Sequence, residues 1–219
     1  MLPSPFLNAV VGRRSVYKIA NTSPICDKEI RNLVSTTMLN APSCFNSQST
    51  RIVLLLLKEE HQKFWRNTSS ILKAKIGEDA FKGNTEQKLK GFRNGYGTML
   101  FFEDPQQSFF PTYASNFSTW SEHTNAIHQF ILWTAMSERG LGASLQHYSP
   151  LVDSMVVEQW KVPATWQLKA QLVFGELTGR PPQKASLPLE DRMFVYGESS
   201  KGDESKLNTS NYVQKHMRL

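Results

Sequence analysis

The 219-residue sequence has few features that would cross-link a chain or anchor it in a membrane. It contains two cysteines, Cys26 and Cys44, which cannot make a disulfide framework, so a reducing compartment is the simpler interpretation. The longest aliphatic run, Ile52–Leu57, is far shorter than the roughly 20 residues of a membrane-spanning helix. No basic segment precedes an apolar stretch at the N-terminus, so we expect no signal peptide. We therefore expect a soluble protein of the cytoplasm, without excluding the nucleus, and no membrane partner.

Runs of positive charge are also missing. The 25 Lys and Arg residues exceed the 19 Asp and Glu residues and give a net charge of +6, but no run of five basic residues occurs. An excess of positive charge favours anionic partners, and a phosphate-bearing cofactor satisfies it as well as nucleic acid does. Without clustered basic residues the sequence argues against nucleic acid as a partner.

The common catalytic motifs are missing as well. No Walker loop, Gly-x-Gly-x-x-Gly, His-Glu-x-x-His or Gly-x-Ser-x-Gly segment occurs. His123 and His128 are five residues apart, not the four that place two ligands on one helix face, and we interpret both as surface residues. No metal site is expected. These absences leave an enzyme that uses an organic cofactor, or a protein without catalytic activity.

The pattern of apolar residues predicts a mixture of helices and strands without a regular βαβ alternation, which favours an α+β fold. The expected strands are 51–57, covered on both faces, and 97–103, 142–146 and 166–177. The expected helices are 6–11, one capped at Ser23-Pro24, helix-compatible sequence over 59–90, and 117–139 with an apolar stripe. We expect one domain over residues 1–197 and a polar C-terminal tail over 198–219.

Three clusters have the chemistry of a cofactor site. Arg13-Arg14-Ser15 follows a helix and offers the charge and hydroxyl that a phosphate monoester needs, although such a pair is often a solvated helix end. The polar loop 41–48 offers amide groups suited to the edge of a heteroaromatic ring, or is a capping loop. The small residues of 140–144 permit close approach to a ligand, or form a helix C-cap.

Taken together and in this order, four segments resemble the FMN-dependent nitroreductase family, and in particular its small fungal and bacterial branch. They are Arg13-Arg14-Ser15-Val16-Tyr17, the Pro-Ser-x-x-Asn-x-Gln loop of residues 41–48, Gly91–Asp104 and Gly140–Tyr148. The resemblance covers residues 6–197. It implies a nitroreductase-like fold, with a central, mostly antiparallel sheet flanked by helices, in a homodimer that binds FMN at its interface.

The resemblance also assigns roles to residues. Arg13 is similar to the contact to the FMN phosphate and ribityl chain, with Arg14 and Ser15 beside it and Tyr17 at a position that is basic in many relatives. Ser43, Cys44 and Asn46 match the loop that reaches the flavin from the partner subunit, with Gln48 behind them. Leu145, Gln146 and His147 match the segment over the flavin ring. Lys184, or alternatively Arg180, stands near the expected C-terminal phosphate contact.

The activity that the resemblance implies is reduction of an electron-poor substrate, such as a nitroaromatic or a quinone, at the expense of NADH or NADPH. Hydride passes through the flavin, so no catalytic side chain is assigned. Aromatic candidates for the substrate pocket are Tyr96, Phe109, Phe110, Tyr113, Trp120 and Tyr148. Two alternatives remain open: a dedicated redox step in a fungal biosynthetic pathway, and a non-catalytic flavin-fold regulator of lipid or stress signalling.

Overall fold

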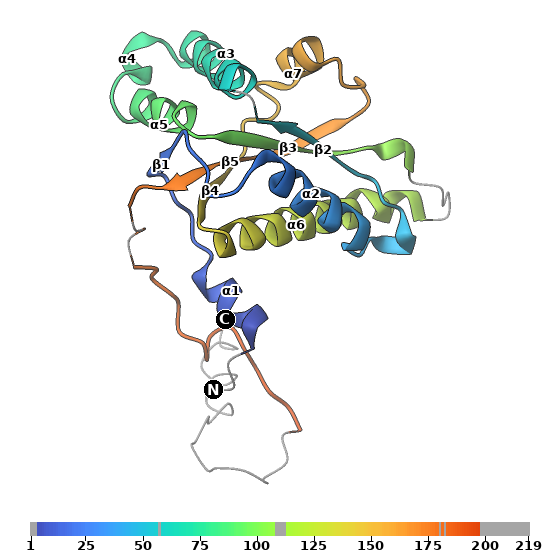
Figure 1. Ribbon diagram of the computed structural model, residues 1–219. Helices are drawn as coiled ribbons and strands as arrows, with labels where there is room; N and C mark the ends of the chain where they lie inside the picture. Colours follow the sequence, from blue (N-terminus) through green and yellow to red (C-terminus); the bar gives the residue numbers. More distant parts are fainter. Residues whose placement is uncertain (1–3, 57, 108–112, 180, 182, 198–219) are drawn as a thin grey trace, which may run out of the picture. The chain divides into compact units, whose positions relative to one another are not determined.

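The computed structural model describes residues 4–56, 58–107, 113–179, 181 and 183–197 (Figure 1). The chain divides into two units, Met1–Pro181 and Pro182–Leu219. In the second unit, the described residues 183–197 contain turns but no helix or strand, and the backbone amides of Arg192 and Met193 donate to Leu189 O. The tail expected over 198–219 lies outside the described residues.

The first unit is built on a five-stranded antiparallel sheet. The strands are β1 (Ile19–Ala20), β2 (Thr50–Leu55), β3 (Gly97–Glu103), β4 (Leu141–Gln146) and β5 (Gln167–Leu177). The long strand β5 lies in the middle: one edge pairs with β3 and then with β1, and the other edge pairs with β4. β2 pairs with the far edge of β3. The α+β class and the antiparallel sheet predicted from the sequence are confirmed.

Helices cover both faces of this sheet. Figure 1 shows α3, α4, α5 and α7 over one face and α2 and α6 over the other, with α1 beyond α6. Their bounds are α1 (Pro5–Gly12), α2 (Asp27–Asn40), α3 (Lys58–Ile76), α4 (Glu78–Phe81), α5 (Asn84–Arg93), α6 (Ala114–Glu138) and α7 (Asp153–Trp160), with short 3₁₀ turns at Cys44–Asn46 and Pro105–Gln107. No described helix is long and apolar enough to span a membrane.

β3 separates two hydrophobic cores. Successive side chains of a strand point to opposite faces, so Leu100 and Phe102 pack with Trp65 and its neighbours, and Met99 and Phe101 pack with Leu132 and its neighbours. Every residue of β3 is buried. β2 was expected to be covered on both faces, but its interior residues are only half-buried because β2 lies at the edge of the sheet.

Two helix predictions need correction. α2 begins at Asp27, not after Ser23, because the Glu29 carboxylate accepts the Cys26 amide hydrogen bond (3.1 Å) and closes a capping box there. α6 forms where expected, but its apolar stripe is not its buried face. Ile127 and Phe130 are each 36% exposed, whereas the buried positions include several polar side chains: Thr124, Asn125, His128 and Gln129. His128 was expected at the surface; its Nδ1 lies 2.9 Å from Thr124 O.

Candidate functional site

Arg13 lies where α1 ends and the chain becomes extended. Its backbone amide donates to Ala9 O, and its ψ of 123° turns the chain away from the helix. The guanidinium stacks over the ring of Trp133 on α6, with Cζ 4.3 Å from the ring centroid. The buried Nε of Arg13 has no hydrogen-bond partner among the described residues. Burial, and secondarily the charge of Arg14, lower the pKa of Arg13. An anion beside the guanidinium would favour its charged form and so offset both effects.

The segment that follows Arg13 runs along the outer edge of β4. Ser15 forms a parallel bridge with Ala143, and the Val16 amide donates to Ala143 O (2.9 Å). Gly142 makes this approach possible, because a Cβ there would lie 2.9 Å from Val16 Cγ1. The close approach predicted at the small residues of 140–144 is therefore to this segment of the chain itself. Gly140 adopts a φ of +79° directly after α6.

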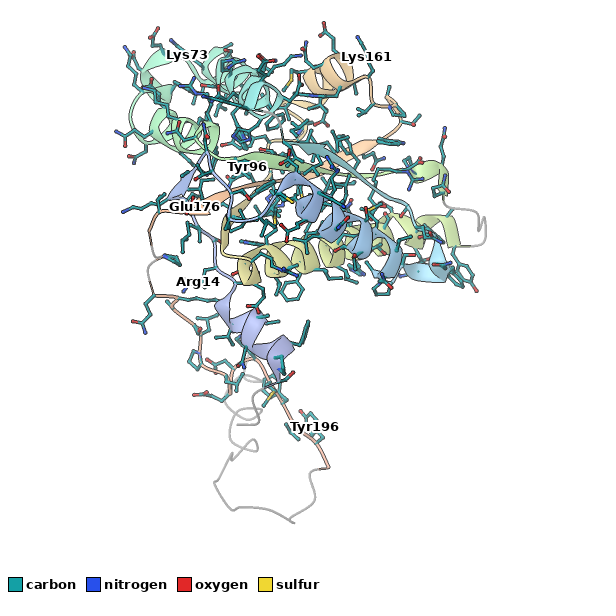
Figure 2. The ribbon with its side chains drawn as sticks, viewed as in Figure 1. Arg14, Lys73, Tyr96, Lys161, Glu176 and Tyr196 are labelled. Carbon is teal, nitrogen blue, oxygen red and sulfur yellow. The ribbon has the colours of Figure 1, made fainter. Side chains whose placement is uncertain are left out.

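The side chains of this segment divide between core and surface. Val16 is buried, whereas Ser15 and Tyr17 are exposed. Arg14 is half-buried, and Figure 2 shows it between α1 and the sheet. Tyr17 stands where the resemblance expected a basic residue, but the Lys88 ammonium lies 6.0 Å from the centroid of its ring. Burial, with a smaller contribution from Tyr17, raises the pKa of Tyr148 to about 12. Both tyrosines join one aromatic group: Tyr17 lies 6.1 Å from the ring centroid of Phe92, and Trp65 lies 4.8 Å from Phe92 and 5.7 Å from Tyr148.

In residues 145–148, the groups that face the outer edge of β4 are mainly backbone groups. The C=O of Ala143 faces Val16, and alternate residues of a strand turn their N–H and C=O to the same edge, so those of Leu145 face that edge too. Gln146 is buried and its Nε2 donates to Ser144 Oγ (2.8 Å), whereas the His147 side chain is exposed. The Tyr148 amide donates to Gln171 Oε1 (2.8 Å), a contact that no sequence signal indicated.

The loop that contains Ser43, Cys44, Asn46 and Gln48 is folded on itself and strained. The Ser43 hydroxyl accepts the Gln48 amide hydrogen bond (3.0 Å). Phe45, Asn46 and Gln48 have positive φ values of 52°, 54° and 48°. Non-glycine residues in this region cost roughly 1–3 kcal/mol each and gather at functional sites. Cys44 is half-buried and is a free cysteine.

Phe45 joins an aromatic group at the start of α6. Its ring is 53% exposed and lies 5.6 to 6.2 Å from the ring centroids of Tyr113, Phe117 and Trp120. Two of the predicted pocket aromatics, Tyr113 and Trp120, are thus brought together. Tyr96 instead donates to Asp27 Oδ1 (2.5 Å), and Phe109 and Phe110 lie outside the described residues.

A buried carboxylate, Glu103, holds the end of this loop in place. It is 2% exposed and accepts hydrogen bonds from Ser49 Oγ (2.5 Å), Thr50 Oγ1 (2.6 Å) and Asn125 Nδ2 (2.7 Å). Arg51 adds a bond from Nη1 to Gln48 O (2.7 Å) and an ion pair with Asp104 (3.1 Å). Sequence reasoning missed Glu103 because its partners come from two other elements.

The two clusters lie at opposite ends of α6. Arg13 contacts Trp133 near the C-terminal end, and Phe45 contacts Trp120 near the N-terminal end. Thirteen residues of helix at 1.5 Å each separate them by about 20 Å. One chain therefore does not bring both clusters to the same point. Lys184 belongs to the second unit, and Arg180 lies outside the described residues.

Among the described residues, no group of three His, Cys, Asp or Glu side chains could hold a metal ion. Buried His61 is instead hydrogen-bonded on both ring nitrogens, with Nδ1 2.9 Å from Thr98 Oγ1 and Nε2 3.1 Å from Phe92 O.

Comparison with known proteins identifies the family. The family model described as "Nitroreductase family" matches residues 10–176, which include the Arg13 segment, the loop 43–48 and β4. The chain belongs to this family. Two curated yeast (Saccharomyces cerevisiae) nitroreductases are similar: FRM2 is 31% identical over 82% of this chain and 91% of its own length, and putative nitroreductase HBN1 is 28% identical over 86% and 96%.

Solved structures of the nitroreductase family share the fold. Nitroreductase CinD from Lactococcus lactis, in complex with nicotinic acid, superposes with a TM-score of 0.80 at 34% identity and covers 87% of this chain and 99% of its own. CinD has also been solved with 4-nitrophenol. An FMN-bound nitroreductase from Desulfitobacterium hafniense has a TM-score of 0.63 at 16% identity over 89% and 100%, which shows the fold alone. Family and fold together support an oxidoreductase of the nitroreductase type.

Proposed function

We propose that this nitroreductase is an FMN-dependent homodimer that oxidises NADH or NADPH and reduces nitroaromatic, quinone-like or other electron-poor small molecules. The family membership supports the reaction type. The FMN of the D. hafniense protein supports the cofactor, and the nicotinic acid and 4-nitrophenol bound to CinD support the two kinds of small molecule.

The observation that carries the proposal is the state of Arg13. Its guanidinium is stacked, partly desolvated and leaves a buried Nε without a partner among the described residues. An unsatisfied buried donor costs roughly 1–3 kcal/mol, more when it is charged. A phosphate monoester beside Arg13 supplies both the acceptor and the opposite charge, and the exposed Ser15 hydroxyl is a further donor two residues along.

In this proposal the chain's own groups bind and orient the cofactor. When bound, FMN supplies hydride transfer between a reduced nicotinamide and an electron-poor substrate. Arg13, Arg14 and Ser15 bind its phosphate end, and the backbone of Leu145, Gln146 and His147 holds its ring end. Because the side chain of Gln146 is committed to Ser144, its contribution is its backbone.

A homodimer brings the two clusters of the site together. Ile127 and Phe130 are exposed apolar residues near residue 126, the midpoint of α6. A twofold axis passing there sets the N-terminal end of one α6 beside the C-terminal end of the other. The loop 43–48 of one protomer then reaches the Arg13 segment of its partner. The exposed side chains of Phe6, Leu7 and Val11 on α1 provide further apolar surface for such an interface.

The test is a visible absorption spectrum of the purified protein, repeated after anaerobic addition of NADH or NADPH. We expect a flavin spectrum that bleaches with the nicotinamide and recovers when 4-nitrophenol or a quinone is added. Arg13→Ala should lose bound FMN and turnover together. Arg66→Ala is the matched control, because Arg66 is exposed on α3.

Two results would contradict the proposal. A protein that is colourless and takes up no added FMN would favour the non-catalytic regulator. Full FMN occupancy in Arg13→Ala would show that Arg13 does not bind the FMN phosphate.

A further inference from the structure

Trp133 is in contact with Arg13, and each of the two side chains has a buried N–H group without a hydrogen-bond partner among the described residues. Among the described residues, the buried side-chain polar atoms without a partner include Arg13 Nε, Trp133 Nε1 and the hydroxyl of the next residue, Thr134. Arg13 Cζ lies 4.3 Å from the centre of the Trp133 ring. Two donors without acceptors therefore belong to one stacked pair at the C-terminal end of α6.

A stacked pair of this kind has a defined chemical preference. The indole face attracts the guanidinium but accepts none of its N–H hydrogen bonds in the usual way, so those donors are left for another acceptor. The acceptor that suits them is an anion with several oxygens, and phosphate has three available on one group. A tryptophan that served only to fill space would place its Nε1–H in water or on a protein carbonyl.

We propose that Trp133 is a positioning residue for the FMN phosphate: its ring orients the Arg13 guanidinium, and its Nε1–H offers a second donor to the same anion. This inference rests on the proposed function and goes beyond it by assigning the preference for a phosphorylated flavin to a residue of α6. Because Trp133 would act beside Arg13 at the phosphate end of the cofactor, its substitution should affect FMN and not riboflavin.

The experiment measures the affinities of the apoprotein for FMN and for riboflavin by quenching of flavin fluorescence. We expect Trp133→Phe to weaken FMN binding about tenfold, because it loses the N–H donor and weakens the stacking, and to change riboflavin binding by less than about twofold. In an Arg13→Ala background the stacking is already lost, so Trp133→Phe should weaken FMN binding by a smaller factor than it does in the wild type.

The matched control is Trp160→Phe. Trp160 also stacks with a cation, Lys63 at 5.7 Å, and donates its Nε1–H to Glu60 (2.8 Å), but it lies on α7 at the opposite face of the sheet. The ratio of FMN to riboflavin affinity should not change in this variant. Circular dichroism verifies folding, and Trp133→Tyr replaces Trp133→Phe if the latter does not fold.

The outcomes separate this inference from the proposed function. Equal losses for FMN and riboflavin, unchanged FMN affinity, or additive effects of Trp133→Phe and Arg13→Ala would each overturn the role of Trp133. If the wild-type protein binds neither flavin, the proposed function itself fails. If the preference for FMN over riboflavin is lost in Arg13→Ala but unchanged in Trp133→Phe, the proposed function stands and Trp133 has no part in phosphate binding.

Discussion

At the scale of single residues, the interior contains polar side chains whose hydrogen bonds join separate elements. Thr98 on β3 contacts both His61 Nδ1 and Trp65 Nε1 at 2.9 Å, and His61 also reaches Phe92 O on α5. None of these residues is exposed beyond 1%. The group links α3, α5 and β3 within the core, so its protonation state affects the stability of the fold.

Protonation of His61 is expected to destabilise the protein in mild acid. Burial lowers the pKa of His61 from 6.5 to about 4, so the unfolded chain binds a proton in this range and the folded chain does not. Stability is therefore complete above pH 6.5 and falls by about 3 kcal/mol between pH 6.5 and 4. Urea unfolding at several pH values measures this loss.

A substitution isolates the contribution of His61 from that of the carboxylates. His61→Gln should unfold with a shallower dependence on pH between 6.5 and 4. His123→Gln is the control, because His123 is exposed, and it should retain the wild-type slope. Identical slopes in all three proteins would show that His61 does not titrate in this way.

Glu103, like His61, is a buried polar residue whose hydrogen bonds join separate elements, here at the C-terminal end of the loop 43–48. Glu103→Gln removes the charge from three charge-assisted hydrogen bonds, and its NH₂ group requires a neighbouring hydroxyl to turn from donor to acceptor, so we expect a loss of about 2 kcal/mol in unfolding free energy. The substitution should displace the loop 43–48 but not the Arg13 segment. The affinities for FMN and for riboflavin should therefore fall by the same factor. Thermal unfolding and flavin titration measure the two effects.

The control for Glu103 is Glu122→Gln. Glu122 is exposed and pairs with Lys169 at the surface, where such pairs contribute little. Wild-type stability in Glu103→Gln, or a loss confined to FMN, would contradict the role given to Glu103.

At the scale of elements, the docking of the Arg13 segment on β4 depends on the missing side chain at Gly142. A Cβ there would lie 2.9 Å from Val16 Cγ1 and 3.0 Å from Ile19 Cγ2, closer than carbon atoms approach without movement. We expect Gly142→Ala to displace residues 13–19, lower stability by about 1–3 kcal/mol and weaken FMN binding. Thermal unfolding measures the loss of stability, and FMN titration measures the loss of affinity.

Gly12→Ala is the matched control for this substitution. No atom lies within 4 Å of a Cβ built at Gly12, and the residue is helical, where alanine is favoured over glycine. This variant should be as stable as the wild type or more so. If Gly142→Ala matches it, the close approach of Val16 is not what requires glycine.

At the scale of the whole molecule, the exposed apolar residues at the middle of α6 predict a dimer whose loss also removes the cofactor. Ile127→Asp or Phe130→Asp places a charge on that surface, so we expect monomers in size-exclusion chromatography with light scattering, together with loss of bound flavin. In the proposed two-chain site the flavin is lost with the dimer, because each site would need the loop 43–48 of the partner.

The control uses an apolar residue of similar exposure elsewhere. Ile76, at the end of α3, is 39% exposed, and Ile76→Asp should leave both mass and flavin content unchanged. Monomers that retain full flavin occupancy would contradict the two-chain site, and dimers in all three variants would place the interface elsewhere.

The prediction from sequence was most successful where one element carries its own signal. The buried run 97–103 and the long helix ended by Gly140 were read directly from local pattern. β1 has two residues, too few to show any period. α7 was not predicted, although it has the same eight residues of length as α1, which was. The apolar stripe of α6 was detected, but its direction was not, because sequence cannot tell a core from a face left for a partner.

For the candidate site, the sequence alone predicts a group that suits a phosphate, because Arg13 and Arg14 carry the charge. The phosphate-bearing flavin is what the resemblance of the four ordered segments to FMN-dependent nitroreductases implies, and residue type and order are properties of the chain alone. Only the tertiary structure decided which residues support that chemistry. Trp133, Glu103 and Gln171 are distant in sequence from the groups they contact, and those contacts arise from packing, which only the folded arrangement creates.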